Sequence, residues 1–303
     1  MKLLLTGAYP WKQEQIRAVE ALGHETTFIQ DERIPLQEQG IDPAAYEGVV
    51  GNGLFLYTPI EQFTSLRYIQ LTSAGFDRVP MDYVQQHGIV IRNARGVYSV
   101  PMAEFALCGV LQLFKGAAHF LRAQQEHAWR KHRGLRELAG SRVCVVGCGS
   151  VGMACAERFG AMGCKVSGVD VVTAPRPGFD AIVPLEQLEA ELPQADVVVL
   201  TLPLTKETRH LINAARLARM KPGAVLVNIA RGAVVDTAAL TEALTQQLGG
   251  AVLDVFEEEP LGADSPLWDM PNVILTPHNS FVGDGNNARM AAVIMDNLRQ
   301  YNE

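Results

Sequence analysis

Four ionisable residues in the second half of the chain have the types and positions that chemistry requires: Arg231, Asp254, Glu259 and His278. Each lies at or shortly after the end of an apolar run that reads as a buried strand. Because the strands of a parallel sheet end at one edge, we expect these four side chains to meet there. A histidine can exchange a proton near neutral pH, and an arginine can hold a carboxylate with two parallel hydrogen bonds. The pattern indicates acid–base chemistry on an anionic ligand.

A second ligand is predicted by the stretch from Val143 to Asp170, which reads strand, glycine turn, helix, strand, acid. In this arrangement the first glycine allows a tight turn, the second lets the backbone approach a pyrophosphate, and the third lets helix and strand pack closely. The helix N-terminus favours the pyrophosphate, and the acid can accept hydrogen bonds from the adenosine ribose. The predicted dinucleotide contacts in this stretch are Gly147, Gly149, Ser150, Val151, Gly152 and Asp170.

Together the two patterns fit hydride transfer between a dinucleotide and a 2-keto acid. Reduction places negative charge on the carbonyl oxygen, and His278 is the natural proton donor to it. Glu259 can hydrogen-bond the imidazole and fix its tautomer, while Arg231 can grip the carboxylate and polarise the ketone. Asp254 can hold the carboxamide of the nicotinamide. Spacing alone does not choose among the three successive glutamates that end at Glu259.

Other interpretations fit parts of the sequence. Taken singly, His278 fits the role of a turn residue, and Arg231 that of a surface residue, as well as each fits a catalytic role. Each of the three glutamates, taken singly, fits a solvated acidic run better. A non-catalytic NADH-sensing interaction protein would share the fold, and an S-adenosyl-linked enzyme would use the same glycine turn. The second of these leaves Arg231 and His278 unexplained, whereas reduction of a keto acid accounts for the whole set.

The pattern of apolar runs predicts an α/β protein with parallel sheets. Five runs occur in the first 95 residues, and six lie between residues 143 and 278, enough for a complete doubly wound sheet. Helix-compatible spacing covers residues 13–22, 207–220, 237–248 and 287–301, and a helix is expected to begin at Ser99 or Val100, just before Pro101. The helix 287–301 is too short to form a domain and should pack back onto the first one.

The composition limits the class of protein, the partners and the cellular location that fit this chain. The chain has 303 residues, 48% of them hydrophobic and 19% charged, with a net charge of −7. This is typical of a globular protein and argues against nucleic acid or an anionic membrane as the main partner. We expect no membrane segment, no metal site and a cytoplasmic location. The five cysteines read as buried or semi-buried thiols in a reducing compartment, although Cys148 lies inside the glycine turn, where an exposed thiol would make cofactor binding sensitive to oxidation.

Five motifs resemble the D-isomer-specific 2-hydroxyacid dehydrogenases, the family of phosphoglycerate, glycerate, hydroxypyruvate and D-lactate dehydrogenases. They are GCGSVG with Asp170, TLPLTKETRHLIN, KPGAVLVNIARGAVVDTAAL, GAVLDVFEEEPL and PLWDMPNVILTPH. The resemblance covers roughly the second half of the chain, with TSAGFDRV the clearest match in the first half. It implies catalytic Arg231, Glu259 and His278, since the family's acid directly precedes a proline.

The resemblance also implies an architecture. It predicts a Rossmann-type NAD-binding domain at 99–280 and a smaller flavodoxin-like substrate domain built from 1–98 and 281–303, with a homodimer formed through the Rossmann domain. The further cofactor contacts that it implies are Thr201, Leu202, Pro203, Thr208, Ala230, Arg231, Asp254 and His278. The substrate contacts that it implies are Asn52, Gly53, Ser73, Gly75, Arg231 and His278. It assigns the substrate carboxylate to the backbone amides of the loop around Asn52 and Gly53.

The choice of cofactor can be predicted separately. An acid at position 170 repels a 2′-phosphate, and the next three residues supply no arginine to bind one. NAD is therefore expected rather than NADP, with Arg176 as the nearby residue that weakens this preference. The sequence does not name the 2-hydroxy acid.

Overall fold

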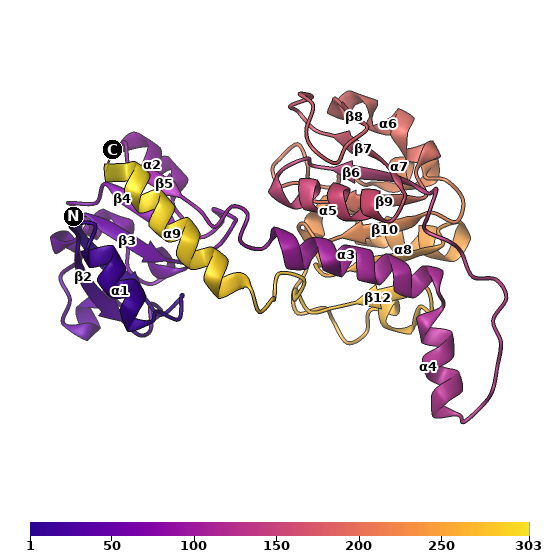
Figure 1. Cartoon of the computed structure of the whole chain (residues 1–303), viewed down its shortest axis with the longest axis horizontal. Coiled ribbons are helices and arrows are strands. Elements are labelled where there is room, and N and C mark those ends of the chain that lie inside the picture. Colours follow the sequence, from indigo (N-terminus) through magenta and orange to yellow (C-terminus); the bar gives the residue numbers. More distant parts are fainter. Residues whose placement is uncertain (303) are drawn as a thin grey trace. The chain divides into compact units, whose positions relative to one another are not determined.

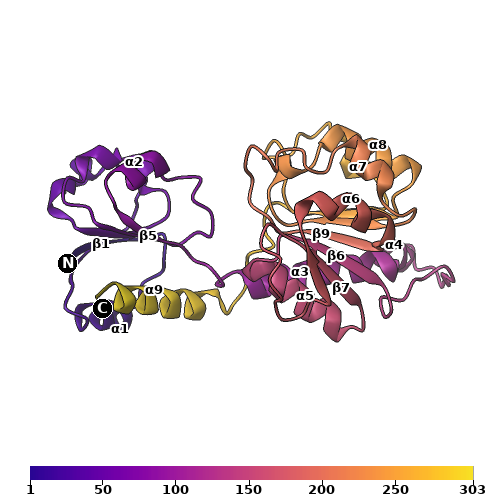
Figure 2. The ribbon, with the colours of Figure 1, turned by 90° about the horizontal axis from the view of Figure 1, so that it is seen from above.

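The computed structural model describes residues 1–302 and divides into two compact units. Unit 1 contains Met1–Tyr98 and the C-terminal segment from Gly283, and unit 2 contains Ser99–Val282. Each unit has its own parallel sheet with helices on both faces (Figures 1 and 2). The predicted α/β class with two parallel sheets is confirmed.

The sheet of unit 1 has five parallel strands in the order β2-β1-β3-β4-β5, the order of flavodoxin-like folds. Its strands are β1 (Lys2–Thr6), β2 (Glu25–Ile29), β3 (Gly48–Gly51), β4 (Tyr68–Leu71) and β5 (Val90–Arg92). Its helices are α1 (Gln13–Glu20), α2 (Met81–Gln86) and α9 (Asn286–Asn302). The five apolar runs of the first 95 residues thus correspond to the five strands.

Successive side chains of β1 point to opposite faces of the sheet and so contribute to the two hydrophobic cores of unit 1. Leu3 and Leu5 face one side, where they pack with residues of α1 and α9, and Leu4 faces the other side with residues of α2. Figure 2 shows α1 and α9 together below this sheet and α2 above it. Met290, Ile294 and Leu298 form the buried stripe of α9, so the predicted return of the last helix to the first unit is confirmed.

The sheet of unit 2 has seven parallel strands in the order β12-β11-β10-β9-β6-β7-β8. Its strands are β6 (Arg142–Val146), β7 (Lys165–Val169), β8 (Ala181–Val183), β9 (Val197–Leu200), β10 (Val225–Asn228), β11 (Gly250–Leu253) and β12 (Val273–Leu275). Its helices are α3 (Ser99–Phe114), α4 (Ala117–Gln125), α5 (Ser150–Ala161), α6 (Leu188–Glu191), α7 (Ala214–Arg219) and α8 (Thr237–Gln246). Helices α3 and α5 cover one face and α6, α7 and α8 the other.

In both sheets the first strand along the chain is an inner strand, and the order in which the chain adds strands reverses direction once. In unit 1 the chain runs from β1 outward to β2 and then returns to place β3 on the other side of β1. In unit 2 it runs from β6 to β7 and β8 and returns to place β9 on the other side of β6. The loops that follow the two central strands diverge at such a switch point and leave a crevice where ligands bind in open parallel sheets.

One strand of unit 2 was not predicted, and one predicted helix was too long. The sheet has a seventh strand, β8, whose three residues at the sheet edge are too short and too exposed to give an apolar run. The helix expected over 207–220 is only α7, Ala214–Arg219. Before it, the backbone amide of Thr205 donates to the hydroxyl of Thr208, and Ile212 pairs with Val235 in an isolated bridge. These contacts compete with helix formation until Asn213 caps α7 by accepting from Arg216 N.

Helix α3 is the most apolar helix and lies in the core of unit 2. Ala103, Ala106 and Val110 are buried beside residues of β6, α5 and β11. Within residues 1–302, no single helix is long and apolar enough to cross a membrane; α3 and α4 reach the required length only as a pair, bent by 65°.

Candidate active site

The glycine turn between β6 and α5 is packed against the loop that follows β9. Gly147 has a φ of +95°, and a Cβ there would lie 2.8 Å from the backbone nitrogen of Leu202. A Cβ on Gly152 would lie 2.1 Å from the carbonyl oxygen of Gly147. Both positions require glycine because the neighbouring atoms belong to the backbone and cannot move aside.

Gly149 differs from its two neighbours, since a Cβ there would meet nothing within 4 Å. It is the N-cap of α5 and makes no side-chain capping bond, and the helix hydrogen bonds begin with Met153 N donating to Gly149 O. The first amides of this helix therefore have no side-chain cap and lie at the positive end of its dipole. An open glycine before uncapped amides fits the pyrophosphate of a dinucleotide.

Asp170 follows β7 and is hydrogen-bonded to the glycine turn. One carboxylate oxygen accepts from Cys148 N at 2.6 Å, and the other accepts from Val172 N at 2.9 Å. Arg176 approaches the same carboxylate at 3.7 Å and donates to the carbonyl oxygen of Cys148. The acid is thus held beside the turn, as the sequence predicts, but an arginine lies next to it.

Cys148 is fully buried, which removes the possibility of an exposed thiol in the turn. Its Sγ points toward β7, where a Cβ on Gly168 would lie 2.4 Å from it. Burial, with a further contribution from the charge of Asp170, raises the pKa of this thiol to about 12. Because thiolates rather than thiols react with oxidants, the buried and protonated thiol of Cys148 is not expected to make cofactor binding sensitive to oxidation. Cys108, in contrast, is exposed, contrary to the expectation of buried thiols.

The loop after β9 packs against one side of the glycine turn. Thr201 donates its hydroxyl to the carbonyl oxygen of Gly147 at 2.5 Å. Further along this loop, Thr208 donates to the carbonyl oxygen of Pro203 at 2.8 Å. The predicted cofactor residues of this loop, Thr201, Leu202, Pro203 and Thr208, therefore form one hydrogen-bonded loop that begins against the glycine turn.

Arg231 is placed by the end of β10 and by the glycine after it. The side chain of Asn228 donates to the carbonyl oxygen of Arg231 and accepts from Ala230 N, both at 3.1 Å. A Cβ on Gly232 would lie 1.8 Å from the carbonyl carbon of Phe256. This close approach joins the loop of Arg231 to the loop that follows β11, from which Glu259 comes.

Asp254 connects the ends of three strands. Its backbone nitrogen donates to Asn228 O, and its backbone oxygen accepts from His278 N at 2.8 Å. The carboxylate is completely buried and accepts three hydrogen bonds, from Thr276 Oγ1, Asn279 N and Ser280 N. Asp254 therefore braces the turn that carries His278. Its expected contact with the nicotinamide carboxamide stays a prediction.

The imidazole of His278 is hydrogen-bonded to Glu259, with 2.8 Å between Nδ1 and Oε2. The other oxygen of Glu259 accepts from Phe256 N at 3.0 Å, which fixes the carboxylate. His278 has a φ of +51°, a strained value for a non-glycine residue, and its side chain is 44% exposed. With Nδ1 held by the carboxylate, Nε2 is left to face a ligand.

Glu257 takes part in a second histidine–carboxylate pair that sequence reasoning missed. Its Oε2 lies 2.7 Å from His210 Nε2, and its Oε1 accepts from Thr237 N at 2.9 Å. Burial acts to raise the pKa of the Glu257 carboxyl, but these hydrogen bonds outweigh it and lower the pKa overall. The structure thus brings Glu259 to His278 and Glu257 to His210. Nothing in the local spacing distinguishes the two glutamates.

In unit 1 the expected substrate residues lie after β3 and β4, but two of them have an unexpected partner. The backbone amides of Asn52 and Gly53 both donate to the carboxylate of Glu32, at 3.0 and 2.5 Å. After β4, the hydroxyl of Ser73 donates to the carbonyl oxygen of Gly75 at 2.9 Å. Glu32 was not predicted as a site residue because it lies in a loop between two strands with no motif around it.

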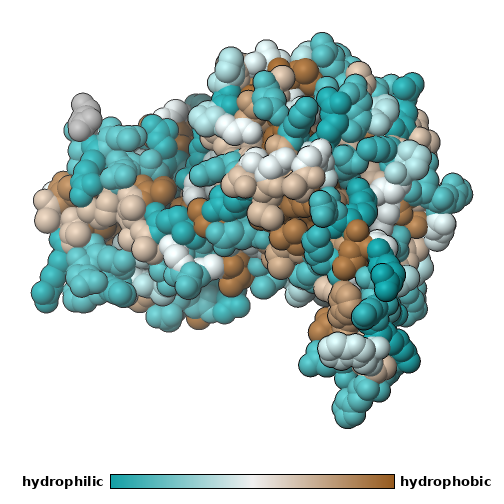
Figure 3. Space-filling view, turned by 45° about the vertical axis from the view of Figure 1, so that its right-hand side comes forward, coloured by the Kyte–Doolittle hydropathy of each residue, from teal (hydrophilic) through white to brown (hydrophobic). Residues whose placement is uncertain are grey.

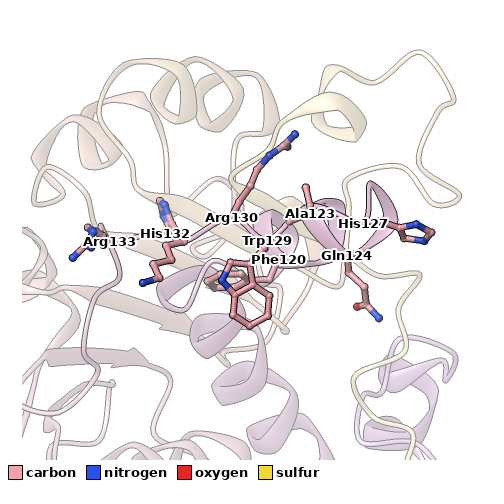
Figure 4. Close-up of a pocket in the computed structure, with 10 residues that line it drawn as sticks. Phe120, Ala123, Gln124, His127, Trp129, Arg130, His132 and Arg133 are labelled. Carbon is pink, nitrogen blue, oxygen red and sulfur yellow. The ribbon is translucent and has the colours of Figure 1, made fainter.

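Beyond α4 the chain runs without helix or strand from Glu126 to Ser141, within the described residues. The segment of α4 and the residues after it projects from unit 2 and shows both hydrophobic and hydrophilic surface (Figure 3). An open hollow of about 730 Å³ is lined by residues between Phe120 and Arg133, with Trp129 96% exposed (Figure 4). The side chains in Figure 4 spread along the segment and do not converge on one point.

Comparison with known proteins identifies the family of this chain. Residues 107–280 match the family model described as "D-isomer specific 2-hydroxyacid dehydrogenase, NAD binding domain". The chain belongs to the D-isomer specific 2-hydroxyacid dehydrogenases. The family suggested by the sequence motifs is therefore confirmed, and the protein is a nicotinamide-dependent 2-hydroxyacid dehydrogenase with two α/β units, each built on a parallel sheet.

Relatives in the family carry different substrate names. The (S)-sulfolactate dehydrogenase of Chromohalobacter salexigens is 36% identical over 80% of this chain and 79% of its own length. The glyoxylate/hydroxypyruvate reductase B of Pectobacterium atrosepticum is 33% identical over 84% of this chain and 82% of its own. A family member from Xanthobacter autotrophicus has been crystallised in complex with NADPH and MES. Its sequence is 32% identical to this chain, and the match covers 99% of this chain and 94% of that chain, with a TM-score of 0.79.

Proposed function

We propose that this dehydrogenase interconverts a small D-2-hydroxy acid and its 2-keto acid, with Arg231, Glu259 and His278 as the catalytic residues. The observation that carries the proposal is the hydrogen bond between His278 and Glu259 at the edge of the seven-stranded sheet where the glycine turn also lies. An imidazole held at Nδ1 by a carboxylate is arranged to exchange a proton through Nε2.

Each residue then has one task. His278 gives a proton to the carbonyl oxygen during reduction and takes it from the hydroxyl during oxidation. Glu259 holds the imidazole in one tautomer and stabilises its protonated form. Arg231 grips the substrate carboxylate and polarises the carbonyl group. The bound dinucleotide, held by the glycine turn and by Asp170, would supply or accept the hydride.

The substrate contacts proposed in unit 1 come from the loops after β3 and β4, namely Asn52, Gly53, Ser73 and Gly75. Because the amides of Asn52 and Gly53 donate to Glu32, the loop after β3 is proposed to contact the substrate through its other atoms. The names of the relatives cover two charge classes of substrate. Glyoxylate and hydroxypyruvate carry one carboxylate, whereas sulfolactate carries a sulfonate in addition. Unit 2 has the same proposed chemistry for both classes, so the choice between them depends on unit 1.

For the cofactor we propose NAD in preference to NADP. The supporting observation is that the carboxylate of Asp170 lies beside the glycine turn, hydrogen-bonded to Cys148 N. A carboxylate there accepts hydrogen bonds from the ribose hydroxyls and repels a 2′-phosphate. Arg176, 3.7 Å from the same carboxylate, offsets part of that repulsion, so we expect slower but measurable use of NADPH.

Replacement of His278 tests the catalytic proposal. We expect His278→Ala to lower turnover of a keto acid by roughly 10²- to 10⁴-fold, while NADH binding persists. The assay is NADH oxidation with glyoxylate, pyruvate, hydroxypyruvate and phosphohydroxypyruvate. His210→Gln is the matched control, because His210 also pairs with a glutamate of the same loop.

Unchanged turnover in His278→Ala would remove the assignment of His278. If the wild-type protein oxidises no NADH with any keto acid, but binds a partner only when NADH is present, the alternative of an NADH-sensing interaction protein replaces the enzyme. Equal losses in His278→Ala and His210→Gln would indicate a structural effect of the loop.

We further propose a cytoplasmic homodimer formed through unit 2. In support, Phe120, Leu121 and Trp129 are exposed on the projecting α4 segment, and apolar side chains that gather on one exposed segment are candidates for an interface. The five cysteines are free, which suits a reducing compartment. Sedimentation of the wild type and of Trp129→Ser tests the dimer; a wild-type monomer would contradict it.

A further inference from the structure

The carboxylate of Glu32 fills the switch point of unit 1. One of its oxygens accepts from the hydroxyl of Thr6 at 2.7 Å and from Asn52 N at 3.0 Å. The other accepts from Gly53 N at 2.5 Å. Thr6 ends β1, and Asn52 and Gly53 follow the end of β3, so Glu32 bridges the two strands between which the sheet reverses direction.

The surroundings of Glu32 are shaped to receive an anion. A Cβ on Gly51 would lie 2.9 Å from Glu32 Oε2, and one on Gly53 would lie 3.4 Å from Oε1. Two glycines thus let the carboxylate approach the backbone, as glycines let a phosphate approach in dinucleotide turns. Successive backbone amides and a hydroxyl are the donors that an anionic ligand would use, and here a side chain of the protein uses them.

The charge of Glu32 also acts on whatever binds at this edge. The stem of Arg78 passes the same loop, with its Cδ 3.9 Å from a Cβ on Gly53. Without Glu32, the crevice would offer two free amides, a hydroxyl and a nearby cation. With Glu32 in place, those donors are taken and a negative charge is added, which opposes any second anionic group.

We propose that Glu32 determines the substrate class, restricting the enzyme to 2-keto and 2-hydroxy acids that carry a single negative charge. This inference rests on the proposed function, because it requires that the loop after β3 contacts the substrate. What Glu32 excludes is a phosphate, sulfonate or second carboxylate beyond the one carboxylate that all these substrates share.

The test compares kcat/KM for two sets of keto acids with NADH. Glyoxylate, pyruvate and hydroxypyruvate carry one charged group, and oxaloacetate, 3-sulfopyruvate and phosphohydroxypyruvate carry two. We expect the wild type to prefer the first set, and Glu32→Gln to raise the ratio of the second set to the first by at least about tenfold. Glu32→Ala, which also frees the amides, should raise it further.

Glu61→Gln is the matched control, since Glu61 is exposed in the same unit and its replacement changes the net charge equally. Its ratio should equal that of the wild type. NADH affinity, measured by fluorescence titration, should be the same in all variants, because unit 2 holds the dinucleotide residues. Equal NADH affinity and melting temperature would show that each variant is folded.

The outcomes separate this inference from the proposed function. A wild type that reduces no keto acid contradicts the proposed function. A wild type that reduces single-charge acids, with the same ratio in Glu32→Gln and Glu32→Ala as in the wild type, overturns the inference alone. A wild type that already reduces doubly charged acids as efficiently as singly charged ones overturns it without any variant, so the inference can be tested even if both variants fail to fold.

Discussion

The two sheets have the same kind of switch point, yet one is open and the other is filled. Between β6 and β9 of unit 2, Gly149 faces open space, and the first amides of α5 have no side-chain cap. Between β1 and β3 of unit 1, the amides of Asn52 and Gly53 are bound by Glu32. Backbone donors thus lie at the switch point of both units, but in unit 1 a carboxylate of the protein itself binds them.

The difference shows how the same sheet topology can bind ligands in two ways, through backbone groups alone or with a selectivity that one side chain sets. An open switch point binds a ligand through backbone groups, so its chemistry is tied to glycine and to helix geometry. A filled switch point can be altered by one side chain without rebuilding the loop. The comparison predicts that substitutions at the open point damage binding and folding, while those at the filled point change selectivity.

Adding a Cβ to the open switch point should have the largest effect. Gly152→Ala places an atom against the carbonyl oxygen of Gly147 and should cost about 3 kcal/mol of stability, measured by urea unfolding. Gly149→Ala should leave stability nearly unchanged but weaken NADH binding by roughly 10- to 100-fold, because the backbone loses its close approach. Gly160→Ala, in the same helix and in open space, should bind NADH normally. Equal behaviour of all three variants would contradict the comparison.

The two histidine–glutamate pairs of unit 2 give the next largest contrast. Glu259→Gln should lower turnover by about 10- to 100-fold, because the imidazole loses the charged partner that fixes it. Glu257→Gln, two residues away, should keep turnover within about twofold, because its partner His210 is not one of the proposed catalytic residues. Steady-state kinetics with the best keto acid measures both. A larger loss in Glu257→Gln would show that the two pairs have exchanged roles.

Asp170→Ala tests whether the carboxylate beside the open switch point determines the choice between NADH and NADPH. Loss of the carboxylate should lower kcat/KM with NADH by about tenfold and raise activity with NADPH, as Arg176 is released toward a 2′-phosphate. Adding Arg176→Gln should abolish the gain with NADPH. If the gain survives in the double variant, a group other than Arg176 binds the phosphate.

The smallest effect concerns the pH dependence of stability. The pKa of Glu257 is lowered in the folded protein, so its stabilising contribution is present above the ordinary pKa of a glutamate and is lost as the pH falls through the lowered value. Because the pair is partly exposed, Glu257→Gln should cost only about 1 kcal/mol at pH 7, and the difference from wild type should vanish in acid. Urea unfolding at a series of pH values measures this. A difference that persists in acid would assign the effect to packing.

Periodicity and motif spacing predicted most of the fold because buried parallel strands are apolar runs and the glycine turn has fixed geometry. The same signals failed where side chains act through tertiary contacts. Strand β8 is a short edge strand, and the segment before α7 is held by threonine hydroxyls and a bridge. Glu32 and the pair of His210 with Glu257 carry no sequence signal, because their partners are 20 or more residues away.

The bracing of the His278 turn by Asp254 has a consequence for heat inactivation. The turn that carries the proposed acid–base residue is hydrogen-bonded to the backbone and carboxylate of the buried Asp254, at the ends of β10 and β11, so the turn can open only if hydrogen bonds to the sheet break. The amides of His278 and Asn279 should exchange with deuterium as slowly as those of the central strands. On heating, activity and the sheet of unit 2 should then be lost in a single transition.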